Sequence, residues 1–172
     1  MSIEDYGHRV KPAGILYVDV FPYHVPVGAE PRFLLLRRRL DVVMPGVWQA
    51  VSGKIAAEER IRRAFVRQVQ RKTGQVPREL FKLDTVTIFY DDYYDTVMMV
   101  PVAACRIEPT PIEIDPKLHT EHRWATLDEA RELVEWPRQV ECMRMVADVL
   151  TGRSPRSPLQ ALPIDDGADS RS

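Results

Sequence analysis

The sequence is poor in cysteine, with only Cys105 and Cys142 among 172 residues. The two lie far apart and form no C-x-x-C pattern, so the sequence predicts neither a zinc site nor a disulfide framework. It also lacks a basic segment followed by an apolar stretch near its start. The longest apolar run, residues 97–105, contains Pro101 and is too short to cross a bilayer. We therefore expect a cytoplasmic protein without a membrane partner.

An excess of either charge is also missing, since 24 Lys and Arg stand against 25 Asp and Glu. Such a balance gives no overall field that would attract nucleic acid or anionic lipid. No P-loop, G-x-S-x-G turn or Cys/His nucleophile pattern is present. Hydrophobic residues make up 45% and charged residues 28%, as is typical of a globular domain. The composition leaves the ligand and the oligomeric state open.

Apolar runs and turn residues predict an order of strands and helices. Strands are expected at six places: 13–21, 32–39, 47–51, 80–90, 94–107 and 122–125. The fourth and fifth strands are joined by Asp91-Asp92-Tyr93, which is typical of a hairpin turn. Helices are expected at 57–73, where Gly74 would end the helix, and at 127–134 and 137–150.

These elements predict one domain over residues 13–151, because 172 residues suffice to bury a single core. An N-terminal extension of residues 1–12 precedes it. Residues 152–172 are rich in Ser, Pro, Asp and Gly and have no periodicity, so we expect a flexible tail there.

The helix expected over 57–73 has an inward stripe that becomes polar halfway along. At about 100° per residue the stripe runs through Ala64 and Phe65 and then meets Gln68, Arg71 and Lys72. Buried polar groups are costly, so this half of the helix would line a water-filled pocket. Alternatively, the helix end lies in solvent, where Arg and Lys suit the C-terminal dipole. The residues themselves leave both interpretations open.

Residues 53–74 resemble the Nudix box, G-x5-E-x7-R-E-U-x-E-E-x-G-U, in which U is a bulky aliphatic residue. Five box positions match: Gly53, Glu59, Arg67, Val69 and Gly74. Residues 47–53, residues 119–124 and the helix that begins at Trp136-Pro137 resemble the family's dATP and dihydroneopterin triphosphate pyrophosphohydrolases. The resemblance covers about residues 13–150. It implies an α/β Nudix fold, a mixed β-sheet sandwiched between helices, with Glu59 and Arg67 as a structural pair.

The box departs from the family at the three positions where glutamates bind magnesium, which are Gln68, Arg71 and Lys72 here. Arg and Lys have no acceptor and repel the cation, and Gln offers one neutral oxygen. The subgroup often has a Glu before the His of its E-H-x-x-x-x-W segment, where this chain has Leu118 before His119. The resemblance therefore implies a scaffold without the metal ligands, and we expect neither a bound metal nor another cofactor.

Three other carboxylates are weaker candidates for catalysis: Glu58, Glu59 and Glu121. Glu58 is better explained as complementing the helix dipole, and Glu121 as a solvated strand residue. His119 and His122 have a spacing that places them on opposite faces of a regular strand, so we interpret them as surface or packing residues.

We expect a Nudix-like protein that binds a small phosphorylated ligand, nucleotide-like in chemistry, with magnesium-dependent pyrophosphohydrolase activity weak or lost. Four side chains would hold the phosphates: Arg38, Gln68, Arg71 and Lys72. One alternative is an active nucleoside triphosphate pyrophosphohydrolase that uses Glu58, Glu59 and Glu121, with magnesium carried in by the substrate. Another is a non-catalytic scaffold for protein interactions.

Overall fold

The fold is described by a computed structural model for residues 14–154 and 159–164. The strands are β1 Tyr17–His24, β2 Arg32–Arg38, β3 Trp48–Gln49, β4 Val51–Lys54, β5 Glu79–Asp91, β6 Thr96–Arg106, β7 His119–Ala125 and β8 Leu159–Leu162. The helices are α1 Ile61–Thr73, α2 Leu127–Leu133 and α3 Pro137–Leu150. Within these residues, no helix is long and apolar enough to cross a membrane.

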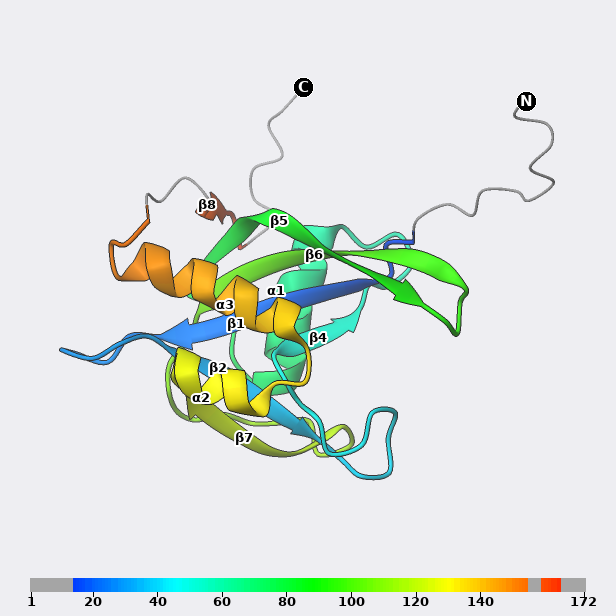
Figure 1. The fold of residues 1–172 in the computed structure, drawn as a ribbon, viewed down its shortest axis with the longest axis horizontal. Coiled ribbons are helices and arrows are strands. Elements are labelled where there is room, and N and C mark those ends of the chain that lie inside the picture. Colours follow the sequence, from blue (N-terminus) through cyan, green and yellow to red (C-terminus); the bar gives the residue numbers. More distant parts are fainter. Residues whose placement is uncertain (1–13, 155–158, 165–172) are drawn as a thin grey trace, which may run out of the picture.

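The strands form one curled, mixed sheet with the order β3-β2-β1-β6-β5-β8 (Figure 1). β1 runs parallel to β6 and antiparallel to its neighbours on the other side. Those neighbours share the same edge of β1, because β4 pairs with Tyr17 to Val20 and β2 pairs with Tyr23 and His24. β7 pairs with the outer edge of β2. Because β2 and β4 lie along the same edge of β1, the end of β2 and its partner β7 come close to α1.

Helices cover both faces of the sheet, as Figure 1 shows. Alternating residues of β1 point to opposite faces, so Val18 and Val20 pack with Phe65 and Val69 of α1. Phe21 and its alternating neighbours pack against α2 and α3 instead. The expected α/β fold, a mixed sheet between helices, is confirmed.

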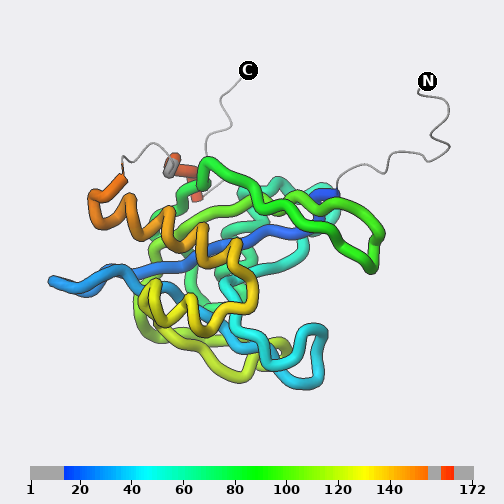
Figure 2. The backbone as a smooth tube through the Cα atoms, in the orientation of Figure 1, coloured from blue at the N-terminus to red at the C-terminus, as the bar shows by residue number. Residues whose placement is uncertain are grey.

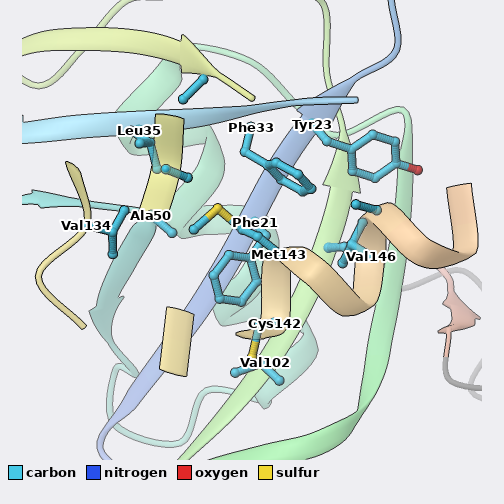
Figure 3. Packing of buried hydrophobic residues seen from close by; sticks show 14 of the residues in the cluster. Phe21, Tyr23, Phe33, Leu35, Ala50, Val102, Val134, Cys142, Met143 and Val146 are labelled. Carbon is cyan, nitrogen blue, oxygen red and sulfur yellow. The ribbon is translucent and has the colours of Figure 1, made fainter. Parts of the chain in front are cut away.

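The core beneath α3 is built from large apolar side chains of β1, β2 and the helix itself (Figure 3). Phe21, Phe33 and Met143 are buried and meet between the sheet and α3. Both cysteines are buried as well, and burial holds the pKa of each thiol above its ordinary value. The cysteines therefore serve as small apolar core residues.

α1 begins four residues later than expected, at Ile61 and not at residue 57. Glu58 has a positive φ of 57° and lies in the turn that precedes the helix, so the first turn of α1 holds no acidic residue. The expectation that Glu58 complements the dipole from within the helix start is therefore corrected. At the other end, Gly74 adopts φ 73° and ends the helix as expected.

Several strand boundaries also differ from the sequence prediction. The first strand is β1 at Tyr17–His24, and the strand expected over 47–51 is divided into β3 and β4 by a bend at Ala50. β7 begins at His119 because that part pairs with the end of β2. The hairpin between β5 and β6 is confirmed, with its turn at residues 92–95 (Figure 2).

The flexible tail expected over residues 152–172 is corrected where Leu159–Leu162 form β8. β8 pairs antiparallel with the start of β5, with Leu162 opposite Leu80. Leu162 and Ile164 pack against the core on the α1 side, which supplies the apolar contact that composition alone did not reveal. The expected N-terminal extension lies outside the described residues.

Candidate functional site

The loop before α1 is fastened to the helix by a two-point ion pair between Glu59 and Arg67. Arg67 Nε lies 2.6 Å from Glu59 Oε1, and the second guanidinium nitrogen lies 2.7 Å from Oε2. Arg67 also donates to the Lys54 carbonyl, and Glu59 accepts from the Ala56 amide. The pair lowers the pKa of Glu59 and raises that of Arg67. The structural pair implied by the resemblance is therefore present.

We expect Arg67→Ala to lower the free energy of unfolding by about 2 kcal/mol, because it leaves the mostly buried Glu59 carboxylate without its partner. Glu59→Gln together with Arg67→Ala should be less damaging, since no unpaired charge remains. Urea unfolding of the two variants measures the difference. An unchanged unfolding midpoint for Arg67→Ala would show that the pair contributes nothing to stability.

Gln68 is packed against β4 and does not face water. It is 2% exposed, and its Nε2 donates to the Lys54 carbonyl. Gly53 permits this contact, because a side chain at position 53 would overlap the Gln68 amide. The Gln68 Oε1 atom is buried and has no hydrogen-bond partner. The water-filled pocket expected beside Gln68 is therefore corrected: the amide fills the space above Gly53.

Lys72 lies one turn further along α1 and is also buried, at 4% exposure. Its Nζ donates to the main-chain carbonyl of Ser52 in β4. Burial lowers the pKa of Lys72 to about 8, with the positive charges of Arg38 and Arg71 adding to the effect. A cavity of about 500 Å³ lies at the opposite end of α1, beside Ile61, so it does not hydrate Lys72.

Arg38 of β2 and His119 of β7 lie beside the C-terminal end of α1. They are paired across β2 and β7, next to a bulge in the register between Arg37 and Arg38. Burial lowers the pKa of Arg38, whose Nε donates to the Val43 carbonyl at 2.6 Å. The bulge brings His119, and not Thr120, opposite Arg38.

His119 is 1% exposed, and neither ring nitrogen has a hydrogen-bond partner. Burial lowers its pKa to about 4, and Lys72 and Arg38 contribute in the same direction. His119 is therefore a neutral imidazole at pH 7, packed beside two cations, whereas His122 is exposed.

Arg71 is the outermost of the three cations, with 54% of its side chain exposed. It lies 3.5 Å from Asp115, which belongs to the loop between β6 and β7. We use the name cation cluster for Arg38, Arg71 and Lys72. Within the cluster, Arg71 is exposed to solvent, whereas Lys72 is buried in the protein.

A buried carboxylate that the sequence did not single out, Asp19, lies on the α3 face of β1. Gln139 of α3 donates to it at 3.2 Å and accepts the Ala50 amide at 3.0 Å. Burial raises the pKa of Asp19, while hydrogen bonds from Ser52 and Gln139 act against the shift. Ser52 thus contacts Lys72 through its carbonyl and Asp19 through its side chain. Only the pairing of β1 with β4 brings these groups together.

The carboxylates proposed for an alternative catalytic site do not converge. Glu59 is held by Arg67, and Glu121 pairs with Arg37 at 2.7 Å on an exposed part of the sheet. Glu58 is exposed in the loop before α1. Within residues 14–154 and 159–164, no group of three or more His, Cys, Asp or Glu side chains could hold a metal ion. The helix face offers one amide oxygen and two cations, which do not fit magnesium.

Comparisons with known proteins agree with this fold. A family model described as the NUDIX domain matches residues 23–145. No curated protein matches the sequence. Among solved structures, a protein described as a NUDIX hydrolase from Listeria monocytogenes superposes with a TM-score of 0.72 at 19% identity, covering 87% of this chain and 100% of that one.

Two further solved structures resemble the chain. The NUDIX domain of Shewanella oneidensis NrtR, complexed with ADP ribose, has a TM-score of 0.65 at 16% identity over 87% of this chain and 99% of its own. The dihydroneopterin triphosphate pyrophosphohydrolase of E. coli has a TM-score of 0.64 at 17% identity over 76% and 93% of the two chains. These likenesses concern the fold, whereas the matched family model covers most of the chain and the box around α1. The chain belongs to the Nudix family.

Proposed function

We propose that this Nudix-family chain binds the phosphate groups of a nucleotide-like ligand directly through the cation cluster, without magnesium. Magnesium-dependent pyrophosphohydrolase activity is weak or absent. Arg71 makes the first contact from solvent, and Arg38 and Lys72 supply further positive charge behind it. Gln68, which the sequence grouped with these residues, is assigned a packing role against Gly53.

The observation that carries the proposal is the meeting of three cations at the face of α1 where the family's glutamates bind metal. Arg38 and Arg71 are near enough to Lys72 to lower its pKa. Holding three like charges together beside a single carboxylate, Asp115, is unfavourable, and a phosphate would relieve the repulsion through charge-assisted hydrogen bonds. The same positive charge would repel a divalent cation.

Two of the similar structures suggest the kind of ligand. The NrtR domain is complexed with ADP ribose, and the E. coli protein is a pyrophosphohydrolase of dihydroneopterin triphosphate. Both of these compounds combine a ring system with a chain of phosphates. A ligand of this chemical class fits a site that offers cations at one end of a sheet-and-helix scaffold.

The proposal is tested by isothermal titration with ADP ribose, nucleoside triphosphates and tripolyphosphate in buffer that contains EDTA. We expect metal-free binding by at least one ligand. Arg71→Ala and Arg38→Ala should each weaken it about ten- to hundredfold, the effect of losing a charge-assisted hydrogen bond. Arg144→Ala, on the α3 face, is the control and should have no effect.

The same ligands with magnesium or manganese should release no phosphate or pyrophosphate above background, because the helix face lacks a carboxylate set for the metal. Turnover near 1 per second, an ordinary enzymatic rate, would instead support the pyrophosphohydrolase alternative. Absence of binding under every condition would support a scaffold for protein interactions.

A further inference from the structure

Asp115 is held rigidly at the edge of the cation cluster by its own loop. Its Oδ1 accepts the Lys117 amide at 3.0 Å. Its main-chain carbonyl accepts the amides of Leu118 and His119, at 3.1 and 2.9 Å. The side chain is only 13% exposed. The carboxylate therefore keeps its position without help from the cations that it faces.

The charge of Asp115 acts on Lys72 and His119, which are both buried in the site. It opposes the lowering of the pKa of Lys72 and of His119, as expected for a nearby anion. Its contact with Arg71 is 3.5 Å long. Two other arginine–glutamate pairs are closer, Arg67 with Glu59 at 2.6 Å and Arg37 with Glu121 at 2.7 Å. Asp115 thus offsets part of the positive charge of the cluster without binding Arg71 tightly.

The other carboxylate near Lys72 cannot have the same role. Asp19 lies on the opposite face of the sheet, where Ser52 and Gln139 donate hydrogen bonds to it. Burial raises its pKa, and its charge acts on Lys72 from that face and not from the side that opens to Arg71. Asp115, in contrast, lies on the side of the cluster where Arg71 reaches solvent.

We propose that Asp115 is an internal counter-anion of the cation cluster, which competes with the ligand's phosphate for Arg71 and thereby limits affinity. This inference rests on the proposed function. A phosphate oxygen and the Asp115 carboxylate are both acceptors for the same guanidinium, so binding must replace the longer contact with a charge-assisted hydrogen bond. Any phosphate that binds also lies beside the fixed negative charge of Asp115.

Asp115→Asn isolates this charge. Asparagine keeps an Oδ1 that can accept the Lys117 amide, so the loop should retain its conformation. Without the carboxylate, tripolyphosphate in EDTA buffer should bind about tenfold more tightly, because a nearby like charge has been removed. Asp115→Glu, which restores the charge, should return the affinity toward that of the native protein. Isothermal titration gives the affinities, and thermal melting verifies folding.

Glu113→Gln is the matched control, since Glu113 lies in the same loop but is exposed, and its side chain lies beside Gly74. An equal gain for Glu113→Gln would mean that only the total charge of the loop matters and would overturn the inference. Unchanged affinity in Asp115→Asn, while Arg71→Ala weakens binding, would also overturn it and leave the proposed function standing. Failure of the native protein and of both Asp115 variants to bind would overturn the proposed function as well.

Discussion

Substitution of Gln68, Arg71 and Lys72 by glutamate in one variant is expected to create magnesium binding and to abolish metal-free phosphate binding. The three positions follow the i, i+3 and i+4 spacing of one helix face. The variant removes two positive charges and adds three negative ones. Carboxylates are the oxygen ligands that magnesium prefers, whereas the native face repels the ion.

The same variant should be less stable than the native protein when no metal is present. A glutamate at position 68 would point an oxygen at the Lys54 carbonyl, where Gln68 now donates a hydrogen bond. A glutamate at position 72 would likewise lose the bond to Ser52. Magnesium bound between the new carboxylates would offset both losses. Saturation at about 100 times the Kd would add about 2.7 kcal/mol to stability. The melting temperature should then rise by several degrees, at about 2–4 °C for each kcal/mol.

Melting curves with and without magnesium, together with titrations of magnesium and tripolyphosphate, measure these effects. The control is Arg63→Glu with Gln70→Glu, which adds negative charge at exposed positions of the same helix. This control should show no stabilisation by magnesium. If the native protein binds magnesium as well as the triple variant does, then Gln68, Arg71 and Lys72 are not the face that determines metal binding.

The sequence predicted the scaffold well because the scaffold depends on local patterns. Gly53, Glu59, Arg67 and Gly74 stand at fixed spacings, and the structure places them in a tight contact, an ion pair and a helix end. Ile, Tyr and Val similarly predicted a strand over 13–21, and β1 forms there at Tyr17–His24. Local patterns carry such information because these contacts join residues that are close in sequence, 8 residues apart for Glu59 and Arg67.

The depth of each polar residue on α1 was harder to predict. The sequence grouped Gln68, Arg71 and Lys72 into one stripe of hydrated side chains. Successive turns of about 100° place Gln68 and Lys72 in line with Phe65, and Arg71 at the margin of the stripe. The buried pair and the exposed Arg71 follow from this difference. Gly53 decides the outcome, because only a residue without a side chain admits Gln68 so close to β4.

The acidic neighbours of the site could not be predicted from local sequence. Asp19 reaches Gln139 across 120 residues, and Asp115 meets Arg71 only because the loop after β6 passes the end of α1. No spacing rule connects such positions. The bulge that brings His119 opposite Arg38 is equally invisible in the sequence, since regular alternation predicts another arrangement.

Raising the pH above 8 is expected to make the protein more stable while making it a poorer binder of phosphate. Both effects come from Lys72, whose pKa is lowered from 10.5 to about 8 by burial and by neighbouring cations. Between these values the unfolded chain holds a proton that the folded chain has released. Stability therefore rises with pH in this window, by about 3 kcal/mol in all if the full shift applies.

Ligand affinity changes in the opposite direction, because neutral Lys72 no longer attracts phosphate. Metal-free affinity for tripolyphosphate should fall about tenfold between pH 7 and pH 9. Binding near pH 8.5 should be accompanied by proton uptake, detected by titration in buffers of different ionisation enthalpy. Lys72→Met, similar in shape but without charge, should lose the Lys72 part of both trends.

Lys72→Arg provides the second comparison, since arginine stays charged throughout this pH range. It should remove the drop in affinity above pH 8, provided that melting shows a folded protein. Stability that rises with pH while ligand affinity falls distinguishes a buried ligand-binding lysine from a general effect of alkali. Such a general effect would lower both stability and affinity. Parallel pH profiles for the native protein and Lys72→Met would show that Lys72 does not titrate near pH 8, and its burial would then have no role in binding phosphate.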